Sequence, residues 1–215
     1  MREQYNKQLE LLSEHMAEMG KLCVEAIQNA IWAFLKQDLE AVKNVERNEN
    51  EINSIEREIE NLCLKLLLLQ QPVAGDLRQV SSALKMITDL ERIGDQALDI
   101  SEIVATAPFI NNGHCELIED MGRATIKMVS ESMDAYFKED LELARAVIDY
   151  DDVVDVLFDR VKNMAVKQIN EDLKAGEFAI DLLMIAKYFE RIGDHATNIA
   201  EWVCFSISGV RPGDH

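Results

Sequence analysis

The chain has 215 residues and a mass of 24.4 kDa, a length that fits one large domain or two small ones. Hydrophobic residues make up 48% and charged residues 29%, which excludes a disordered chain, and 9 Gly with 3 Pro are too few for the turns of a β-sandwich. The formal charge of −18 would repel nucleic acid and anionic membranes. We therefore expect a soluble helical protein with no nucleic-acid partner.

Targeting and redox signals agree with this class. Acidic residues recur through the first twenty positions, which disfavours a secretory signal, and the most apolar run, 62–69, is short and contains Lys65. We expect no direct membrane insertion and a cytoplasmic location. The cysteines are widely separated and form no C-x-x-C pair, which predicts reduced thiols: Cys23, Cys63, Cys115 and Cys204.

Apolar residues recur at helical spacing along the first half of the chain. This periodicity predicts three helices, over residues 3–36, 39–70 and 76–106. Asp38 and Asp76 have the residue type preferred at helix N-caps, and Pro72 with Gly75 marks a turn. We assign residues 1–107 to a first three-helix unit.

The second half repeats this organisation. Residues 108–114 gather Pro, Asn and Gly and are predicted to be a linker. Three further helices are predicted over residues 115–138, 141–174 and 178–206, with Asp140 as an N-cap and Gly176 as a break. We assign residues 115–208 to a second three-helix unit and 209–215 to a tail.

The two halves are internal repeats. "MGKLCVEAIQNAIWAFLKQDLEA" from Met19 aligns with "MGRATIKMVSESMDAYFKEDLEL" from Met121, an offset of 121 − 19 = 102. "ERIGDQALDISE" from Glu91 aligns with "ERIGDHATNIAE" from Glu190, an offset of 190 − 91 = 99, which implies three fewer residues in the second loop. The predicted fold is all-α, with two tandem pseudo-symmetric antiparallel three-helix bundles.

The repeated helix carries an acidic stripe opposite an apolar one. Asp95 and Asp99 lie within about 80° of Glu91 around the helix axis, and Glu190, Asp194 and Asn198 follow the same register. Exposed like charges at this spacing repel by about 0.2–0.5 kcal/mol per pair, and neither stripe contains an interleaved base. A bound partner would offset this repulsion.

The middle helix of each unit provides a possible complement. Asp151 and Asp155 share a face in the second unit, and Glu49 with Asn53 corresponds to them in the first. If neighbouring helices bring these groups to the acidic stripes, the oxygens would form a site for a hard cation, with Fe, Mn, Mg, Zn or Ca as candidates.

Interpretations that need no bound metal remain open for several of these residues. An acidic stripe opposite a core is often only a solvated face. Gly94 and Gly193 lie within helices and indicate the close approach of another helix or of a ligand. Arg92 can pair with nearby acids, and His195, whose counterpart is Gln96, does not fit a symmetric metal shell.

Two segments resemble the PhoU family, regulators of bacterial and archaeal phosphate uptake: "QQPVAGDLRQVSSALKMITDLERIGDQA" from Gln70 and "AIDLLMIAKYFERIGDHATNIAEWV" from Ala179. The likeness spans nearly the whole chain. It implies an all-α fold and a repeated acid-x-x-x-Asp motif that binds metal, often as multinuclear clusters on the bundle surface. By motif match, the ligands would be Glu91 with Asp95, Glu190 with Asp194 and Asp151 with Asp155, continued by Asp99 and Asn198. The pair Glu49 and Asn53 departs from this symmetry.

The resemblance also implies a role. It predicts a homodimeric, non-catalytic regulator that dampens the phosphate-starvation response between the phosphate ABC transporter and a membrane sensor kinase. Two other hypotheses remain. One is a metal-free helical scaffold with solvated acidic faces. The other is a metal-dependent hydrolase of phosphorylated compounds, for which no base or nucleophile is recognisable.

Overall fold

The computed structural model describes residues 2–69, 74–107, 115–172 and 175–212, and these residues fold into six long helices. In chain order the helices are α1 (Arg2–Lys36), α2 (Leu39–Leu69), α3 (Ala74–Thr106), α4 (Cys115–Lys138), α5 (Leu141–Glu171) and α6 (Gly176–Ser208). The described residues contain no strand. The all-α prediction is confirmed, and the periodicity located each of the six helices.

Two of the predicted caps are confirmed and one is wrong. Asp140 precedes α5 and accepts a hydrogen bond from the Leu143 N–H, and Asp38 precedes α2 and accepts one from the Glu40 N–H. Asp76 is not a cap, because α3 begins two residues earlier at Ala74, although a carboxylate in the first turn still favours the helix dipole. Gly176 is the first residue of α6 rather than a break.

Pro72, the linker at 108–114 and the helix end expected at 70 fall on residues outside the described part of the chain. Helix α5 ends at Glu171, with Asp172 as its extended C-cap, so the end predicted at 174 is three residues too late. Helix α6 extends two residues beyond the predicted range 178–206 at each end. Gly75, predicted to lie in a turn, belongs to the first turn of α3. The turns that follow α1 and α4 correspond to each other, because Gln37 and Glu139 both have positive φ and are separated by the repeat offset, 139 − 37 = 102.

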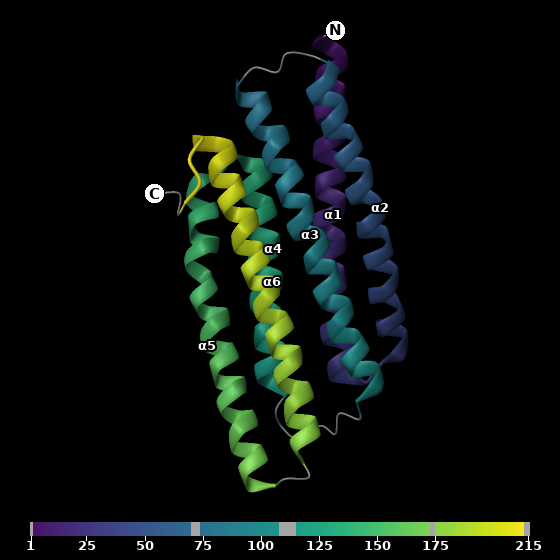
Figure 1. Ribbon diagram of the computed structural model, residues 1–215, viewed down its shortest axis with the longest axis vertical. Helices are drawn as coiled ribbons and strands as arrows, with labels where there is room; N and C mark the ends of the chain where they lie inside the picture. Colours follow the sequence, from purple (N-terminus) through teal and green to yellow (C-terminus); the bar gives the residue numbers. More distant parts are fainter. Residues whose placement is uncertain (1, 70–73, 108–114, 173–174, 213–215) are drawn as a thin grey trace.

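The helices form an elongated bundle in which the two repeats lie side by side (Figure 1). Each repeat is a three-helix bundle whose members all pack on one another. The repeats meet along two seams, one between α3 and α6 and one between α1 and α4, while α2 and α5 lie at the outer edges (Figure 1). This arrangement is the tandem pair of antiparallel bundles that the sequence predicts.

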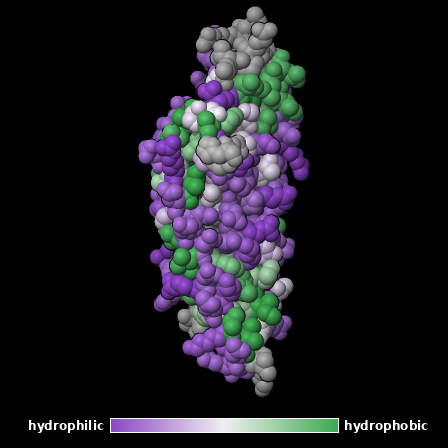
Figure 2. Space-filling model, turned by 60° about the vertical axis from the view of Figure 1, so that its left-hand side comes forward, coloured by the Kyte–Doolittle hydropathy of each residue, from purple (hydrophilic) through white to green (hydrophobic). Residues whose placement is uncertain are grey.

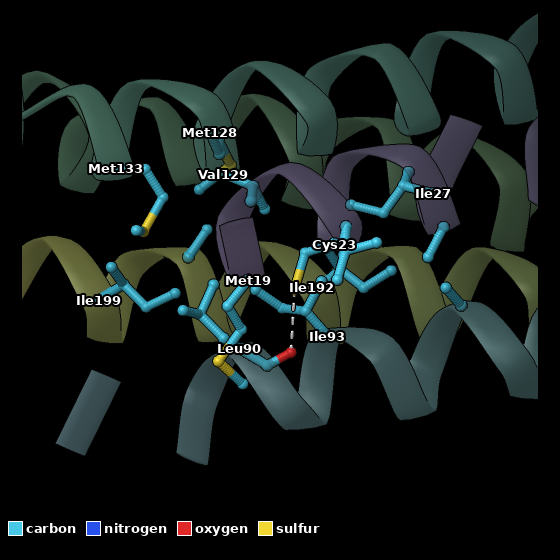
Figure 3. Packing of buried hydrophobic residues seen from close by; sticks show 14 of the residues in the cluster. Met19, Cys23, Ile27, Leu90, Ile93, Met128, Val129, Met133, Ile192 and Ile199 are labelled. Carbon is cyan, nitrogen blue, oxygen red and sulfur yellow. Dashed lines mark hydrogen bonds between the residues drawn. The ribbon is translucent and has the colours of Figure 1, made fainter. Parts of the chain in front are cut away.

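A single hydrophobic core runs through both repeats. Residues of α1, α3, α4 and α6 interdigitate at its centre, among them Met19, Ile93, Met128 and Ile192 (Figure 3). The buried Cys23 thiol donates a hydrogen bond of 3.2 Å to the Leu90 carbonyl across this core (Figure 3). Each fully buried side chain of this kind contributes about 1.5–3 kcal/mol to folding. The two halves therefore stabilise each other.

The outer surface is mainly hydrophilic. Figure 2 shows the side on which α5 comes forward, where hydrophilic residues cover most of the middle and hydrophobic residues gather toward the ends. Within the described ranges, we find no helix with the length and apolar character needed to cross a membrane.

Candidate functional site

Helices α5 and α6 bring four carboxylates together on one face. These are Asp151, Asp155, Glu190 and Asp194, which we call the second acidic cluster. Partial burial, followed by the negative charges of Asp194 and Asp155, raises the pKa of Asp151 to about 6. Burial and Glu190 raise the pKa of Asp194 in the same way. The cluster holds more negative charge than its surroundings neutralise.

Gly193 allows the second acidic cluster to form. A Cβ at this position would lie 3.2 Å from the Asp151 Oδ1 and 3.4 Å from Val154, so a side chain here would crowd the carboxylate that α5 directs at α6. Gly94, its counterpart in α3, similarly makes room for the buried Ile52 of α2, at 3.0 Å. The close helix approach predicted at both glycines is confirmed.

The corresponding face of the first repeat carries the first acidic cluster, on α2 and α3. It comprises Glu49, Glu56, Glu91 and Asp95. Burial, with the neighbouring Asp95 charge next in weight, raises the pKa of Glu91, and burial also raises that of Glu56. Asn53 donates its amide to Glu49 at the edge of this cluster.

A basic side chain pairs with carboxylates at the rim of each acidic cluster. Arg92 lies 3.3 Å from Glu91 and donates a hydrogen bond of 2.9 Å to Asp95, as predicted, while Lys187 pairs with Glu190. Both bases are largely exposed and each lies within four residues of its partners on the same helix, so these ion pairs contribute little to stability. They compensate only part of the charge of the clusters.

The final residue of each predicted stripe, Asp99 in α3 and Asn198 in α6, lies at the seam between the repeats. Asn198 donates a hydrogen bond of 3.2 Å to Asp89 of α3, and the Nδ1 of His195 lies 2.9 Å from the same carboxylate. Asp99 occupies the related position on α3. Burial first, and then the negative charges of Glu102 and Asp95, raise the pKa of its carboxyl, while Arg191 of α6 acts in the opposite direction. Asp99 and Asn198 therefore face the other repeat and not the middle helix of the repeat to which they belong.

The clusters have suitable donors but not a closed coordination shell. Among the described residues, no three His, Cys, Asp or Glu side chains are close enough to hold one ion. Carboxylate oxygens are the ligands of hard cations, and several of these groups have raised pKa values that a bound cation would lower. Metal binding at either cluster would require the carboxylates to turn inward and away from Arg92 or Lys187.

The sequence patterns above do not indicate two of the residues at this site, Glu56 and Asp89. Glu56 lies two helical turns beyond Glu49 on α2, so the spacing i, i+7 was the available signal for it. Asp89 precedes the repeated motif, and nothing in the pattern of α3 alone indicated that it would pair with His195 across the seam.

Comparison with known proteins identifies the family. The PhoU domain matches residues 16–104 and again 118–203. A "phosphate-specific transport system accessory protein PhoU homolog" from Clostridium acetobutylicum is 33% identical over 95% of this chain and 94% of its own, and one from Pseudomonas aeruginosa is 33% identical over 97% and 87%.

Solved structures agree with the sequence comparisons. The crystal structure of PhoU from Pseudomonas aeruginosa superposes with a TM-score of 0.92 at 32% identity, covering 96% of this chain and all of that one. The PhoU structure from Streptococcus pneumoniae shares the fold, with a TM-score of 0.87 at 23% identity and coverage of 96% and 98%. With both repeats matched and the whole helical arrangement shared, the chain belongs to the PhoU family.

Proposed function

We propose that this protein is a non-catalytic accessory regulator of phosphate transport. The supporting observation is the similarity along nearly its full length, in both repeats, to proteins named as accessory proteins of the phosphate-specific transport system. In this role it acts in the cytoplasm, as a homodimer, between the phosphate ABC transporter and a membrane sensor kinase. There it restrains phosphate uptake when phosphate is plentiful.

The regulatory proposal is tested in the source organism. Deleting the gene should raise phosphate uptake and the expression of starvation genes in phosphate-replete medium, and the intact gene supplied in trans should restore repression. The measurements are labelled phosphate uptake and a reporter of the starvation response. Unchanged uptake and reporter activity in the deletion strain would contradict the proposal.

We further propose that the two acidic clusters bind divalent or iron cations. The support is their repetition: in both repeats, carboxylates of two adjacent helices gather around a residue whose pKa is raised by burial and by its acidic neighbours. When bound, the cation supplies positive charge that neutralises the cluster and presents open positions to an anionic partner. In the second repeat the ligands would be Asp151, Asp155, Glu190 and Asp194. In the first they would be Glu49, Glu91 and Asp95, together with the side-chain amide oxygen of Asn53.

Metal analysis of protein purified without chelator tests this proposal. We expect stoichiometric metal in the wild type and its loss from one repeat in Glu91→Ala plus Asp95→Ala, and from the other in Glu190→Ala plus Asp194→Ala. A matched control is Glu46→Ala plus Glu51→Ala, which removes two exposed acids of α2 beside the first cluster and should retain all the metal. Wild-type protein that stays metal-free under Fe, Mn, Mg, Zn and Ca supply would overturn the proposal.

A metal-free helical scaffold is the alternative that one observation favours. Arg92 and Lys187 already occupy the rims of the clusters as counter-ions. On this alternative, the two double variants restore repression in the deletion strain as well as the wild type does, and neither carries less metal. Loss of repression together with loss of metal supports the metal-binding proposal instead.

A further inference from the structure

The residues that follow α6 turn back along the molecule as a short strap, residues 209–212. Gly209 has a φ of 78° and donates its N–H to the Phe205 carbonyl at 2.8 Å, which ends α6 in a left-handed cap that reverses the chain. The Val210 N–H then donates a hydrogen bond of 3.2 Å to the Ser208 hydroxyl. The strap therefore lies against the first turns of α5 and the last turns of α6 (Figure 1).

Arg211 anchors this strap to α6. Its guanidinium donates two hydrogen bonds, of 2.9 and 2.7 Å, to Oε2 of Glu201, and its Cζ lies 4.4 Å from the centroid of the Trp202 ring. The side chains of Arg211 and Glu201 are only 29% and 22% exposed, so solvent screens this ion pair less than a fully exposed one. A carboxylate next to an aromatic ring suits a guanidinium better than an ammonium group, because only the guanidinium can stack and donate two hydrogen bonds together.

The first repeat keeps only half of this site. By the repeat offset of 99, Glu102 and Ile103 correspond to Glu201 and Trp202. The carboxylate is therefore present in both repeats and the aromatic ring in one. The guanidinium site is a property of the second repeat and does not follow from the duplication of the helix.

A cavity of about 300 Å³ remains between the strap and the two helices. Leu141 and Ile148 of α5 give it an apolar floor, and the opposite charges of Arg145 and Asp149, also on α5, cancel. The strap contributes Val210, which is still 58% exposed. The strap thus covers this surface without filling it, and an aliphatic side chain larger than valine would bury more apolar area there.

A segment from another protein could replace the strap by offering the same groups. The strap is tethered to its site, so it competes with an effective concentration of about 1 mM and yields to a segment that binds more tightly. An arginine would take the place of Arg211 on Glu201 and Trp202, and a neighbouring aliphatic side chain would enter the cavity. The net charge of −18 favours the approach of a basic segment.

We propose that this end of α5 and α6 is a docking site for a protein segment that carries an arginine next to an aliphatic residue, and that the strap occupies the site in the free protein. Glu201 and Trp202 bind the guanidinium, and the cavity floored by Leu141 and Ile148 takes the aliphatic side chain. The proposal rests neither on metal binding nor on the role in phosphate transport.

Isothermal titration calorimetry with a peptide tests the proposal. The probe is the acetylated and amidated hexapeptide SGVRPG, the sequence of residues 208–213. It should bind saturably to full-length Arg211→Gln, whose strap has lost its anchor, and roughly tenfold more weakly to wild type, where the strap competes. Leucine in place of the valine of the peptide should tighten binding by about twofold to fourfold, the gain expected from one more buried CH₂.

Two controls isolate the guanidinium site. A peptide with citrulline in place of arginine keeps the shape without the charge and should bind Arg211→Gln at least tenfold more weakly. Glu201→Gln added to Arg211→Gln should weaken binding of the arginine peptide by at least tenfold. Glu102→Gln, at the counterpart position in the first repeat, should leave it unchanged, with circular dichroism confirming that each variant is folded.

Four results would each overturn the proposal. They are failure of the arginine peptide to bind Arg211→Gln, equal affinity for Arg211→Gln and wild type, equal affinity of the citrulline peptide, and no gain in affinity from leucine.

Discussion

Asp151 shows how an acidic cluster opposes folding when no cation is bound. Its folded-state pKa of about 6 lies above the ordinary aspartate value of about 3.9, so the folded chain binds this proton more tightly than the unfolded chain does. The free energy of unfolding therefore falls as pH rises from about 4 to about 6, and the full destabilisation is present above that range. Burial and the charges of Asp194 and Asp155 are the cause.

We predict that Asp151→Asn stabilises the metal-free protein at pH 7. The amide keeps the shape and removes the charge, and after a reduction for solvent screening the free energy of unfolding should rise by about 1–2 kcal/mol. Urea denaturation in the presence of chelator at pH 4, 5, 6 and 7 measures this, and the difference should be smallest at pH 4, where the carboxyl is protonated in the folded chain. The exposed Asp152→Asn serves as the control. Equal stabilities of Asp151→Asn and wild type at pH 7 would show that the cluster is already neutralised.

Asp89 should matter for stability although it lies outside the repeated motif. Its carboxylate, 15% exposed, accepts a hydrogen bond from Asn198 and contacts His195, so Asp89→Ala leaves two partly buried groups unpaired. We expect a loss of about 1–3 kcal/mol in the free energy of unfolding, measured by urea denaturation at pH 7. Thr88→Ala, at the exposed neighbouring position, should change it by less than about 0.5 kcal/mol. Comparable effects of the two substitutions would contradict this account of the seam.

At the scale of helices, close crossings are supported by particular glycines. A Cβ on Gly122 of α4 would lie 2.3 Å from Cδ1 and 2.5 Å from Cγ1 of Ile31, a buried residue of α1. We predict that Gly122→Ala costs about 1–3 kcal/mol, because Ile31 must move within a packed core and this outweighs the better helix propensity of alanine.

The matched control for this crossing is Gly176→Ala. A Cβ there meets nothing within 4 Å, and Gly176 begins a helix, so the substitution should leave stability unchanged or raise it slightly. Thermal denaturation of both variants measures the contrast. A Gly122→Ala protein as stable as wild type would mean that α1 and α4 can separate slightly without loss of packing.

Helix positions were predictable from the sequence, but the partners of each helix face were only partly so. The periodicity that located α3 also placed Glu91 and Asp95 opposite the core, and both lie there. It grouped Asn198 with the same stripe because a helical wheel describes one isolated helix. In the fold, Asn198 is turned far enough around α6 to contact Asp89 of the other repeat. Contacts between repeats depend on how two helices pack, which local periodicity does not encode.

For the whole molecule, the decisive feature is the core that crosses both seams. Residues of the first repeat such as Met19 pack in one cluster with residues of the second such as Ile192 (Figure 3). Separating the repeats would expose this apolar surface at about 25 cal/mol per Å². The internal sequence repeat indicates two units but not their interdependence, because the same pattern could equally describe two separately stable domains.

We predict that the two repeats unfold in one transition. The chain has one tryptophan in each, Trp32 on α1 and Trp202 on α6, so Trp32→Phe and Trp202→Phe each leave a single fluorescent reporter in a different repeat. Fluorescence and far-UV circular dichroism should give the same urea midpoint within each variant, because unfolding of either repeat exposes core residues that pack against the other repeat. Trp202 packs against Arg211, so Trp202→Phe will lower the midpoint for both probes together. A transition reported by one repeat at clearly lower urea than the loss of total helix would instead establish independent domains.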